Sequence, residues 1–428
     1  MSDQPNVIFI TSHDVGRHLG CYGARVNTPR LDAFASAGVR CDTAWCAAPI
    51  CSPARAAFAT GRFPHANGVR GLTHFGWDLH EGETHLAERF AGAGYTTALA
   101  GLQHETRHPD RRGLGNHLTG GSRSAKVVGE TAAAFFGEVD GPFYLQVGFF
   151  EPHRDRNGGF GPYPPARADE ADVFPWLAPT PEAVAEVAKF NGAIEGLDEG
   201  VGLLLDGLDA SGHAENTLVV FVSDHGVPFP LAKASCYEAG LGVVLLARWP
   251  GGGIDGGRVV DLPIAGVDVT PTILDAVGLR VDGAMHGRSV LSAWRGGPMD
   301  ARPIFGEIDF HGYHDPIRAV RFGGRKLIVN FAAAPRFYDT SQQWHAPTRP
   351  RHIDDPRNEK HPRLELFNLD TDPHELTNVA DDPAFAADRR TGLQLLADHM
   401  RATDDPLLTQ PPHEPAAAEA LALLREGV

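Results

Sequence analysis

The chain has 428 residues, of which 42% are hydrophobic and 21% are charged, and its formal net charge is −16 at pH 7. This length exceeds what one ordinary hydrophobic core supports, so we expect two domains, residues 1–300 and 301–428. The acidic excess excludes a general affinity for nucleic acid or for an anionic membrane surface.

Through the first 300 residues, short apolar runs alternate with helical patterns. Strands are predicted over residues 6–11, 96–100, 143–149, 217–223 and 242–247. Helices are predicted over residues 28–38, 84–93, 129–139 and 181–209, and the first of these has Thr28 as N-cap and Pro29 at its first position. The alternation predicts an α/β fold with a large, mixed and mostly parallel sheet that is sandwiched by helices.

The pattern changes after about residue 300. Residues 317–322 and 325–331 flank Gly323-Gly324 and predict a β-hairpin, and residues 363–369 predict a further strand. A helix is predicted over residues 383–402, with Asp382 as its N-cap. These elements predict a smaller C-terminal α+β domain that contains an antiparallel sheet.

Polar side chains follow four of the predicted strands. In chain order these are His13 and Asp14; Gln103, His104 and Glu105; Glu151, His153 and Arg154; and Asp224 and His225. Taken singly, each Asp fits a turn and each His fits a structural hydrogen bond. Ligands of open parallel sheets bind beyond the carboxyl ends of the strands, where these side chains converge. Together they therefore favour a divalent cation site built from Asp14, Asp224 and His225.

Cys51 begins a predicted helix in the run Cys51-Ser52-Pro53-Ala54-Arg55. A thiol at a helix N-terminus has a lowered pKa, and the same helix end can bind an anion. Arg55 lies one turn along on the same face and adds a full positive charge. The alternative is a buried structural cysteine at a helix cap.

These motifs together resemble the type I, formylglycine-dependent sulfatases of the alkaline-phosphatase superfamily. The Cys-x-Pro-x-Arg signature is followed by the matching run Thr60-Gly61-Arg62. The resemblance spans nearly the whole chain, from Asp14 to the C-terminal run Glu365-Leu366-Phe367-Asn368-Leu369. The runs Pro152-His153-Arg154 and Val227-Pro228-Phe229-Pro230 make it closest to the sulfamidase, or heparan N-sulfatase-like, branch.

The resemblance implies a chemistry and a set of roles. Cys51 would be oxidised to formylglycine, whose hydrate attacks sulfur and later expels sulfate. The implied cation ligands are Asp14, Asp224, His225 and the modified Cys51, with His13 as a further candidate. Arg55 would hold the hydrate, while His104, His153 and Lys233 would contact the sulfuryl oxygens. We also predict substrate contacts for Gln103, Glu151, Arg154, His311 and His314.

Three positions depart from the family pattern. His13 stands where many members have a second aspartate, and His225 stands where asparagine is frequent. Oxygen ligands favour calcium, the leading expectation, whereas imidazole suits manganese or zinc. Leu102 stands where the family often has a lysine, so one cation that would contact sulfate is missing.

The predicted activity is hydrolysis of a sulfate ester or sulfamate on a small substrate, such as an N- or O-sulfated sugar. A phosphonate monoester or phosphodiester hydrolase is the alternative, motivated by Asp224-His225, and a non-catalytic binding protein is a third reading. The polar cluster Glu307, Asp309, His311, His314 and Asp315 predicts either the mouth of the pocket or a solvated loop.

The expected partners are the sulfated substrate and a formylglycine-generating enzyme, without nucleic acid or membrane, and a homo-oligomer is compatible with the sequence. The N-terminus shows no signal-peptide pattern, and the five cysteines form no metal-type pair. We therefore expect a cytoplasmic protein with reduced thiols.

Overall fold

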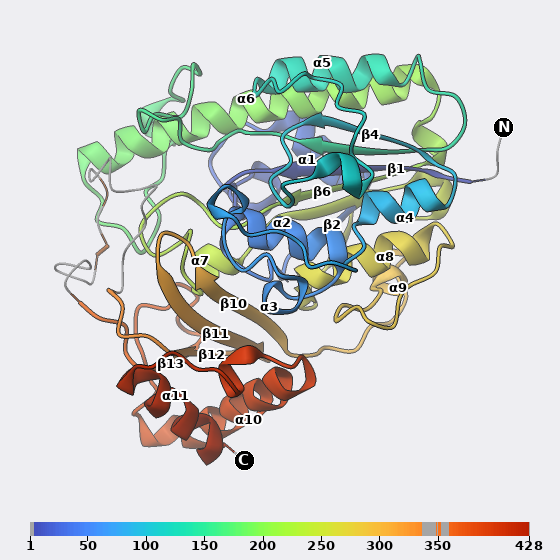
Figure 1. The fold of residues 1–428 in the computed structure, drawn as a ribbon. Coiled ribbons are helices and arrows are strands. Elements are labelled where there is room, and N and C mark those ends of the chain that lie inside the picture. Colours follow the sequence, from blue (N-terminus) through green and yellow to red (C-terminus); the bar gives the residue numbers. More distant parts are fainter. Residues whose placement is uncertain (1–3, 336–347, 349, 352–358, 428) are drawn as a thin grey trace.

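The structure is a computed structural model that describes residues 4–335, 348, 350, 351 and 359–427. Its main feature is a seven-stranded sheet (Figure 1) with the strand order β4 (Thr96–Gly101), β5 (Phe143–Gly148), β1 (Asn6–Ser12), β6 (Thr217–Ser223), β7 (Leu245–Arg248), β2 (Val39–Cys41) and β8 (Arg258–Val260). The first four strands are parallel, as the sequence predicts. Strand β7 runs antiparallel to both of its neighbours, so the sheet is mixed.

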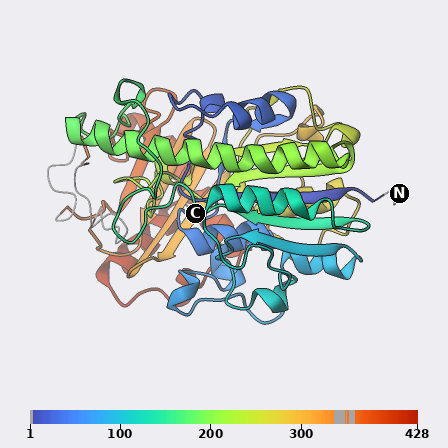
Figure 2. The same cartoon turned by 90° about the horizontal axis from the view of Figure 1, so that it is seen from above.

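Helices cover both faces of this sheet. The face that bears Ile8 and Ile10 packs against α1 (Pro29–Ala37), α5 (Ala125–Phe135) and α6 (Pro181–Ser211). The face that bears Val7 and Phe9 packs against α2 (Cys51–Thr60), α4 (Leu86–Gly92), α8 (Val269–Ala276) and α9 (Leu291–Trp294). Successive residues of a strand point to opposite faces, so the nearly continuous apolar runs of β1 and β6 serve both layers. Figure 2 shows α5 and α6 lying side by side over the sheet.

The C-terminal residues form a second, antiparallel sheet with the order β10 (Ile304–Phe310), β11 (His314–Phe322), β12 (Arg325–Asn330) and β13 (Leu364–Asn368). One face of it packs on α10 (Ala386–Ala402) and α11 (Pro415–Glu426), as Figure 1 shows. Side chains of its other face, including Ile308 and Ile328, join the apolar cluster of the main sheet. The predicted hairpin, strand and helix of this region are confirmed. The division into two domains at residue 300 stays a prediction.

Short elements complete the chain: β3 (Ala44–Trp45) pairs with β9 (Ile264–Ala265), and α3 (Pro64–Asn67) and α7 (Glu238–Leu241) are single turns. Among the described residues, no helix is both long and apolar enough to cross a membrane.

One predicted helix start differs from the structure, and one confirmed start lacks a capping hydrogen bond. Helix α5 begins at Ala125 rather than at residue 129, because the Glu151 carboxylate accepts a hydrogen bond from the Ala125 amide at 2.9 Å. Thr28 is the N-cap of α1 and Pro29 its first residue, as predicted, but the Thr28 side chain makes no capping hydrogen bond. Its hydroxyl instead accepts from the Gly20 amide at 2.9 Å and donates to Asp32 at 3.0 Å.

Candidate active site

The carboxyl ends of β1 and β6 bring two acidic residues together. Ser12 pairs with Ser223 in the register of the two strands, so Asp14 and Asp224 follow at neighbouring places. The Asp14 amide donates to Asp224 Oδ1 at 2.9 Å, and both side chains are fully buried. Asp14 has a φ of 53°, in the left-handed region that a non-glycine residue seldom adopts. The local backbone is therefore held in a sparsely populated conformation by its surroundings, as is frequent at functional sites.

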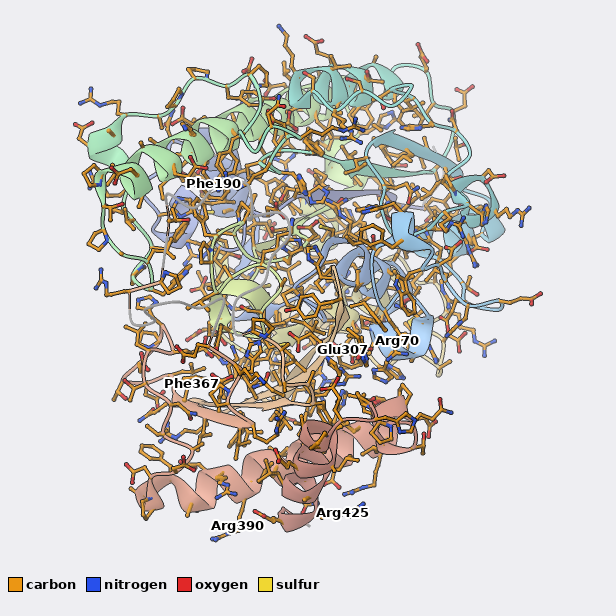
Figure 3. The ribbon with its side chains drawn as sticks, turned by 60° about the vertical axis from the view of Figure 1, so that its left-hand side comes forward. Arg70, Phe190, Glu307, Phe367, Arg390 and Arg425 are labelled. Atoms are coloured by element: carbon orange, nitrogen blue, oxygen red, sulfur yellow. The ribbon has the colours of Figure 1, made fainter. Side chains whose placement is uncertain are left out.

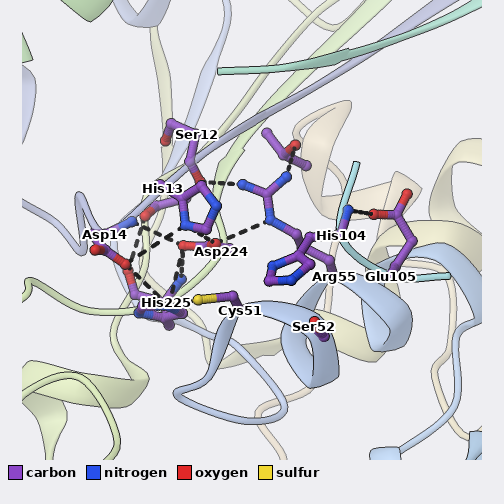
Figure 4. A network of polar contacts seen from close by, with 12 residues as sticks. Ser12, His13, Asp14, Cys51, Ser52, Arg55, His104, Glu105, Asp224 and His225 are labelled. Atoms are coloured by element: carbon purple, nitrogen blue, oxygen red, sulfur yellow. Dashed lines mark hydrogen bonds and ion pairs between the residues drawn. The ribbon is translucent and has the colours of Figure 1, made fainter. Parts of the chain in front are cut away.

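Cys51 is the first residue of α2, and its thiol lies beside these carboxylates (Figure 4). Its Sγ lies 3.3 Å from Nε2 of His225. Burial would raise the pKa of the thiol, but the positive charge of Lys233 and of His225 outweighs it and lowers that pKa well below its usual value. The structure therefore places a thiol with thiolate character at the centre of the cluster.

Two further charged residues are placed against the acids. Lys233 Nζ lies 2.9 and 3.1 Å from the two carboxylate oxygens of Asp14, in a loop where Leu231 and Ala234 both have positive φ. Arg55 Nε donates to Asp224 Oδ2 at 3.0 Å. Against the effect of burial, the charge of Lys233 holds the pKa of Asp14 well below its usual range, and the charges of His13, His225 and Arg55 do the same for Asp224.

The guanidinium of Arg55 forms its hydrogen bonds at the carboxyl ends of β1 and β6. Besides Asp224, it donates to Thr11 Oγ1 at 2.9 Å and to the Ser12 carbonyl at 3.3 Å. That Arg55 also holds the group at position 51 stays a prediction. Its observed contacts orient the carboxylate of Asp224.

Three histidines complete the cluster around Cys51. The rings of His13 and His153 lie 4.7 Å apart, and those of His13 and His104 lie 6.4 Å apart, measured between centroids. His153 is half-buried, and its Nδ1 lies 2.7 Å from the Arg154 carbonyl, so Nδ1 carries the hydrogen and Nε2 is the nitrogen that faces Cys51. Burial and the nearby charge of Lys233 lower the pKa of His153. At neutral pH its ring is accordingly a neutral hydrogen-bond partner.

Three predicted substrate contacts are engaged elsewhere in the protein. The Glu151 carboxylate is buried against the Ala125 amide and the Tyr163 hydroxyl, which bonds it at 2.5 Å. Arg154 is buried, forms an ion pair with Glu186 and lies over the ring of Phe160. Gln103 closes its own loop by accepting from the amides of Glu105 and Thr106. The structure does not turn these three side chains towards Cys51.

The predicted polar cluster of residues 307–315 is not a solvated loop throughout. Glu307 is buried on β10, where its Oε2 lies 2.6 Å from His65 Nδ1, and Asp309 is buried between Arg70 and Arg318. His311 lies in the β10–β11 turn and His314 begins β11, and both side chains are half-buried.

Sequence reasoning missed His74, whose ring stacks on that of His104 at 5.5 Å with an interplanar angle of 4°. The position of His74 depends on a tertiary contact that the sequence does not reveal. The Thr73 amide donates to Ser52 Oγ at 3.1 Å, which holds the segment around His74 against the start of α2.

A cavity of about 470 Å³ is separate from this cluster. It lies beside α7, with Arg17, Trp176, Arg321 and His374 in its walls, and none of the residues grouped around Cys51 lines it. The chemistry, rather than cavity size, identifies the site.

Comparison with known proteins shows which family the chain belongs to. A family model described as Sulfatase matches residues 5–279. N-sulphoglucosamine sulphohydrolase of Homo sapiens is 29% identical, and the match covers 95% of this chain and 92% of that protein. Steryl-sulfatase of Mus musculus is 28% identical over 78% of this chain and 71% of that protein.

Solved structures share the fold. The structure of BT4656 in complex with its substrate D-glucosamine-2-N,6-O-disulfate matches with a TM-score of 0.72 and 19% identity, covering 96% of this chain and all (100%) of that chain. The phosphonate monoester hydrolase of Agrobacterium radiobacter matches with a TM-score of 0.69 and 21% identity, covering 94% of this chain and 95% of that chain. At these identities the likeness shows the fold alone.

Proposed function

The chain belongs to the sulfatase family, whose model matches residues 5–279, and from this premise we propose that it hydrolyses sulfate esters or sulfamates at Cys51. The proposal rests on the position of the Cys51 thiol at the start of α2. Its Sγ lies 3.3 Å from His225 Nε2, next to the buried carboxylates of Asp14 and Asp224. The relative with 29% identity is named for the hydrolysis of an N-sulfated sugar, and another is named for a steryl sulfate. Both N- and O-sulfo substrates therefore belong in the test.

The residues around Cys51 fit a divalent cation. His225 Nδ1 lies 3.0 Å from the Gly226 carbonyl, so once a cation replaces the proton that the neighbouring carboxylates favour on this ring, Nε2 presents a lone pair. That Nε2 lies 3.2 Å from Asp14 Oδ1 and 3.6 Å from Asp224 Oδ1. Three electron-rich atoms so close together require a proton or a cation between them. A histidine that donates its other ring N–H to a carbonyl is also the usual arrangement for a metal ligand.

We propose that Asp14, Asp224, His225 and residue 51 would hold this cation, with His13 near enough to join them. Carboxylates alone suit calcium, whereas the imidazole of His225 favours manganese or zinc. A formylglycine formed from Cys51 would supply, together with the cation, an activated oxygen nucleophile for attack on sulfur.

The side chains around position 51 have separable roles in this proposal. Lys233 supplies positive charge next to Asp14, and it is close enough to Cys51 to lower the pKa of the Cys51 thiol. His153 Nε2, the ring nitrogen that faces Cys51, accepts and returns the proton that the leaving oxygen or nitrogen requires. Arg55 keeps Asp224 ionised and oriented. His104, held against His74, faces residue 51 from the opposite loop.

The test is to produce the protein with and without a formylglycine-generating enzyme and to measure the mass of the peptide that contains Cys51. We expect a mass loss at Cys51 only with the maturation enzyme, and sulfate release only from the matured protein. An alkylatable, unmodified thiol in a protein that still releases sulfate would contradict the proposal.

The phosphonate alternative is less supported, because the similar structures of phosphonate hydrolases share only the fold. Parallel rates on an aryl sulfate, an N-sulfated glucosamine and an aryl phosphonate ester distinguish the two. A phosphonate rate that exceeds both sulfo rates would favour the alternative.

A further inference from the structure

A group of rings lies outside the cluster around Cys51, on the segment that follows α3 and on the strands β10 and β11. Trp77 and Phe310 have ring centroids 4.7 Å apart, and Phe310 stacks on His314 at 4.5 Å. The Arg70 guanidinium lies 5.9 Å from the centre of the Trp77 ring and 5.6 Å from that of Phe310. All four side chains are half-buried, so each keeps a solvent-facing part. We call Trp77, Phe310, His314 and Arg70 the aromatic shelf.

The shelf is rigidly supported from below. Arg70 Nε lies 2.7 Å from Asp309 Oδ2, and Asp309 Oδ1 accepts from the buried Arg318 at 3.0 Å. Gly71 allows Trp77 to lie directly on the backbone, since a Cβ there would be 2.5 Å from the indole Nε1. Figure 3 labels Arg70 and Glu307, which precedes Asp309 by two residues on β10. The rings and the guanidinium are thus positioned before any ligand arrives.

The shelf is tied to position 51 through its own segment. Between Arg70 and Trp77, the Thr73 amide donates to Ser52 Oγ, and the Thr73 hydroxyl donates to the His104 carbonyl at 3.4 Å. The Phe310 amide donates to the Arg70 carbonyl at 3.2 Å, which joins the β10–β11 turn to the same segment. A molecule bound at position 51 that extends along this segment would reach the shelf.

The shelf combines flat rings with one fixed positive charge. No hydrogen bond to the terminal nitrogens of Arg70 is found among the described residues, so they can donate to a planar or tetrahedral anion. Burial lowers the pKa of His314, which leaves Arg70 as the shelf's cation at neutral pH. In a chain with a net charge of −16, such a local cation beside the site is a specific feature.

We propose that the aromatic shelf is a second sugar subsite that binds the acidic saccharide unit adjacent to the sulfated one. The pyranose ring packs on Trp77 and Phe310, and its carboxylate or sulfate group is bound by Arg70. This assignment rests on the proposed sulfatase function and makes it more specific: the preferred substrate is a short acidic oligosaccharide rather than a lone sulfated sugar or an aryl sulfate.

The test compares three substrates with the matured enzyme: a sulfated disaccharide containing a uronic acid, the matching sulfated monosaccharide, and an aryl sulfate. For Trp77→Ala and Arg70→Gln we expect kcat/KM on the disaccharide to fall about tenfold or more, mainly through KM. Rates on the two smaller substrates should change much less. Trp77→Phe, which keeps a ring, should retain most of the disaccharide rate, and Arg390→Gln on α10 is the matched charge control.

A binding measurement separates this proposal from the proposed function. In a Cys51→Ala background, calorimetry should show that Trp77→Ala weakens binding of the same disaccharide about tenfold, with the melting temperature as a check on folding. Binding without turnover by the matured wild type would retain the shelf and reject the sulfatase. Turnover of the disaccharide with equal losses on all three substrates, or with no loss, would overturn the shelf.

Discussion

At the residue scale, Asp224 is the most connected acid of the site. It accepts hydrogen bonds from the Asp14 amide, the His225 amide and Arg55, and it lies 2.9 Å from His13 Nδ1. One side chain therefore orients both strand-end loops as well as offering a ligand oxygen. Its contacts explain why it is ionised although it is fully buried.

Asp224→Asn should reduce both cation binding and activity. The substitution keeps the shape but removes a charge that a hard cation requires, so we expect affinity for the cation to fall about 100-fold or more. Metal content after dialysis and sulfate release at saturating metal are the two measurements. Asp381→Asn on the surface is the matched control. Full activity at one bound cation per Asp224→Asn molecule would reject Asp224 as a ligand.

Leu102 offers a gain-of-function prediction. It follows Gly101 at the end of β4, where the resembled family often has a lysine, and it is half-buried. We expect Leu102→Lys to raise kcat/KM on a sulfate ester about tenfold, because an added cation near the sulfuryl oxygens stabilises the developing charge. Leu102→Met controls for the change in shape. Equal rates in the lysine and methionine variants would show that this position does not contact the sulfo group.

At the element scale, α3 and β10 are joined by a buried ion pair. The Glu307 carboxylate accepts from the His65 amide at 2.7 Å and lies 2.6 Å from its Nδ1. Burial alone would lower the pKa of His65, but the carboxylate outweighs it and the pKa is raised. The other ionisable groups that face this ring are Asp405, Arg318, His286 and His399.

Glu307→Gln should therefore cost stability in a pH-dependent way. A raised histidine pKa gives stabilisation that is fully present below the unfolded value near pH 6.5 and is lost as the pH rises through the folded value. We expect the variant to lose about 2–3 kcal/mol at pH 6 and less at pH 9. Urea unfolding across this range measures it, with the exposed Glu419→Gln as control. A loss that grows from pH 6 to pH 9 would contradict this account.

Elements with strong local patterns were predictable, and those fixed by distant partners were not. The apolar runs of β1, β4, β5 and β6 predicted the four parallel strands whose ends form the site. The antiparallel direction of β7 and the start of α5 depend on tertiary contacts, such as Glu151 at the Ala125 amide. The same limit applies to side chains. The polar residues after the strands and the family resemblance predicted that Asp14, Cys51, Asp224 and His225 lie together, whereas the pairing of Trp77 with Phe310 joins segments that carry no shared local signal.

At the scale of the whole molecule, the acidic charge and the local cations act on a substrate in opposite directions. The net charge of −16 repels an anion at long range, while Lys233 and Arg70 attract it only near the site. The Debye length is about 30 Å at 0.01 M salt and about 8 Å at 0.15 M. Added salt consequently screens the repulsion more than it screens the short-range contacts of buried or half-buried cations.

We therefore expect kcat/KM for an acidic sulfated disaccharide to rise about two- to fivefold between roughly 10 and 150 mM sodium chloride. A singly charged aryl sulfate should show a smaller rise, because the repulsion scales with the charge of the substrate. Initial rates at substrate concentrations well below KM, with potassium chloride as a second salt to exclude specific ion effects, measure the dependence. A steady fall with salt for the disaccharide would mean that local cations dominate its approach and that the acidic surface has no influence on it.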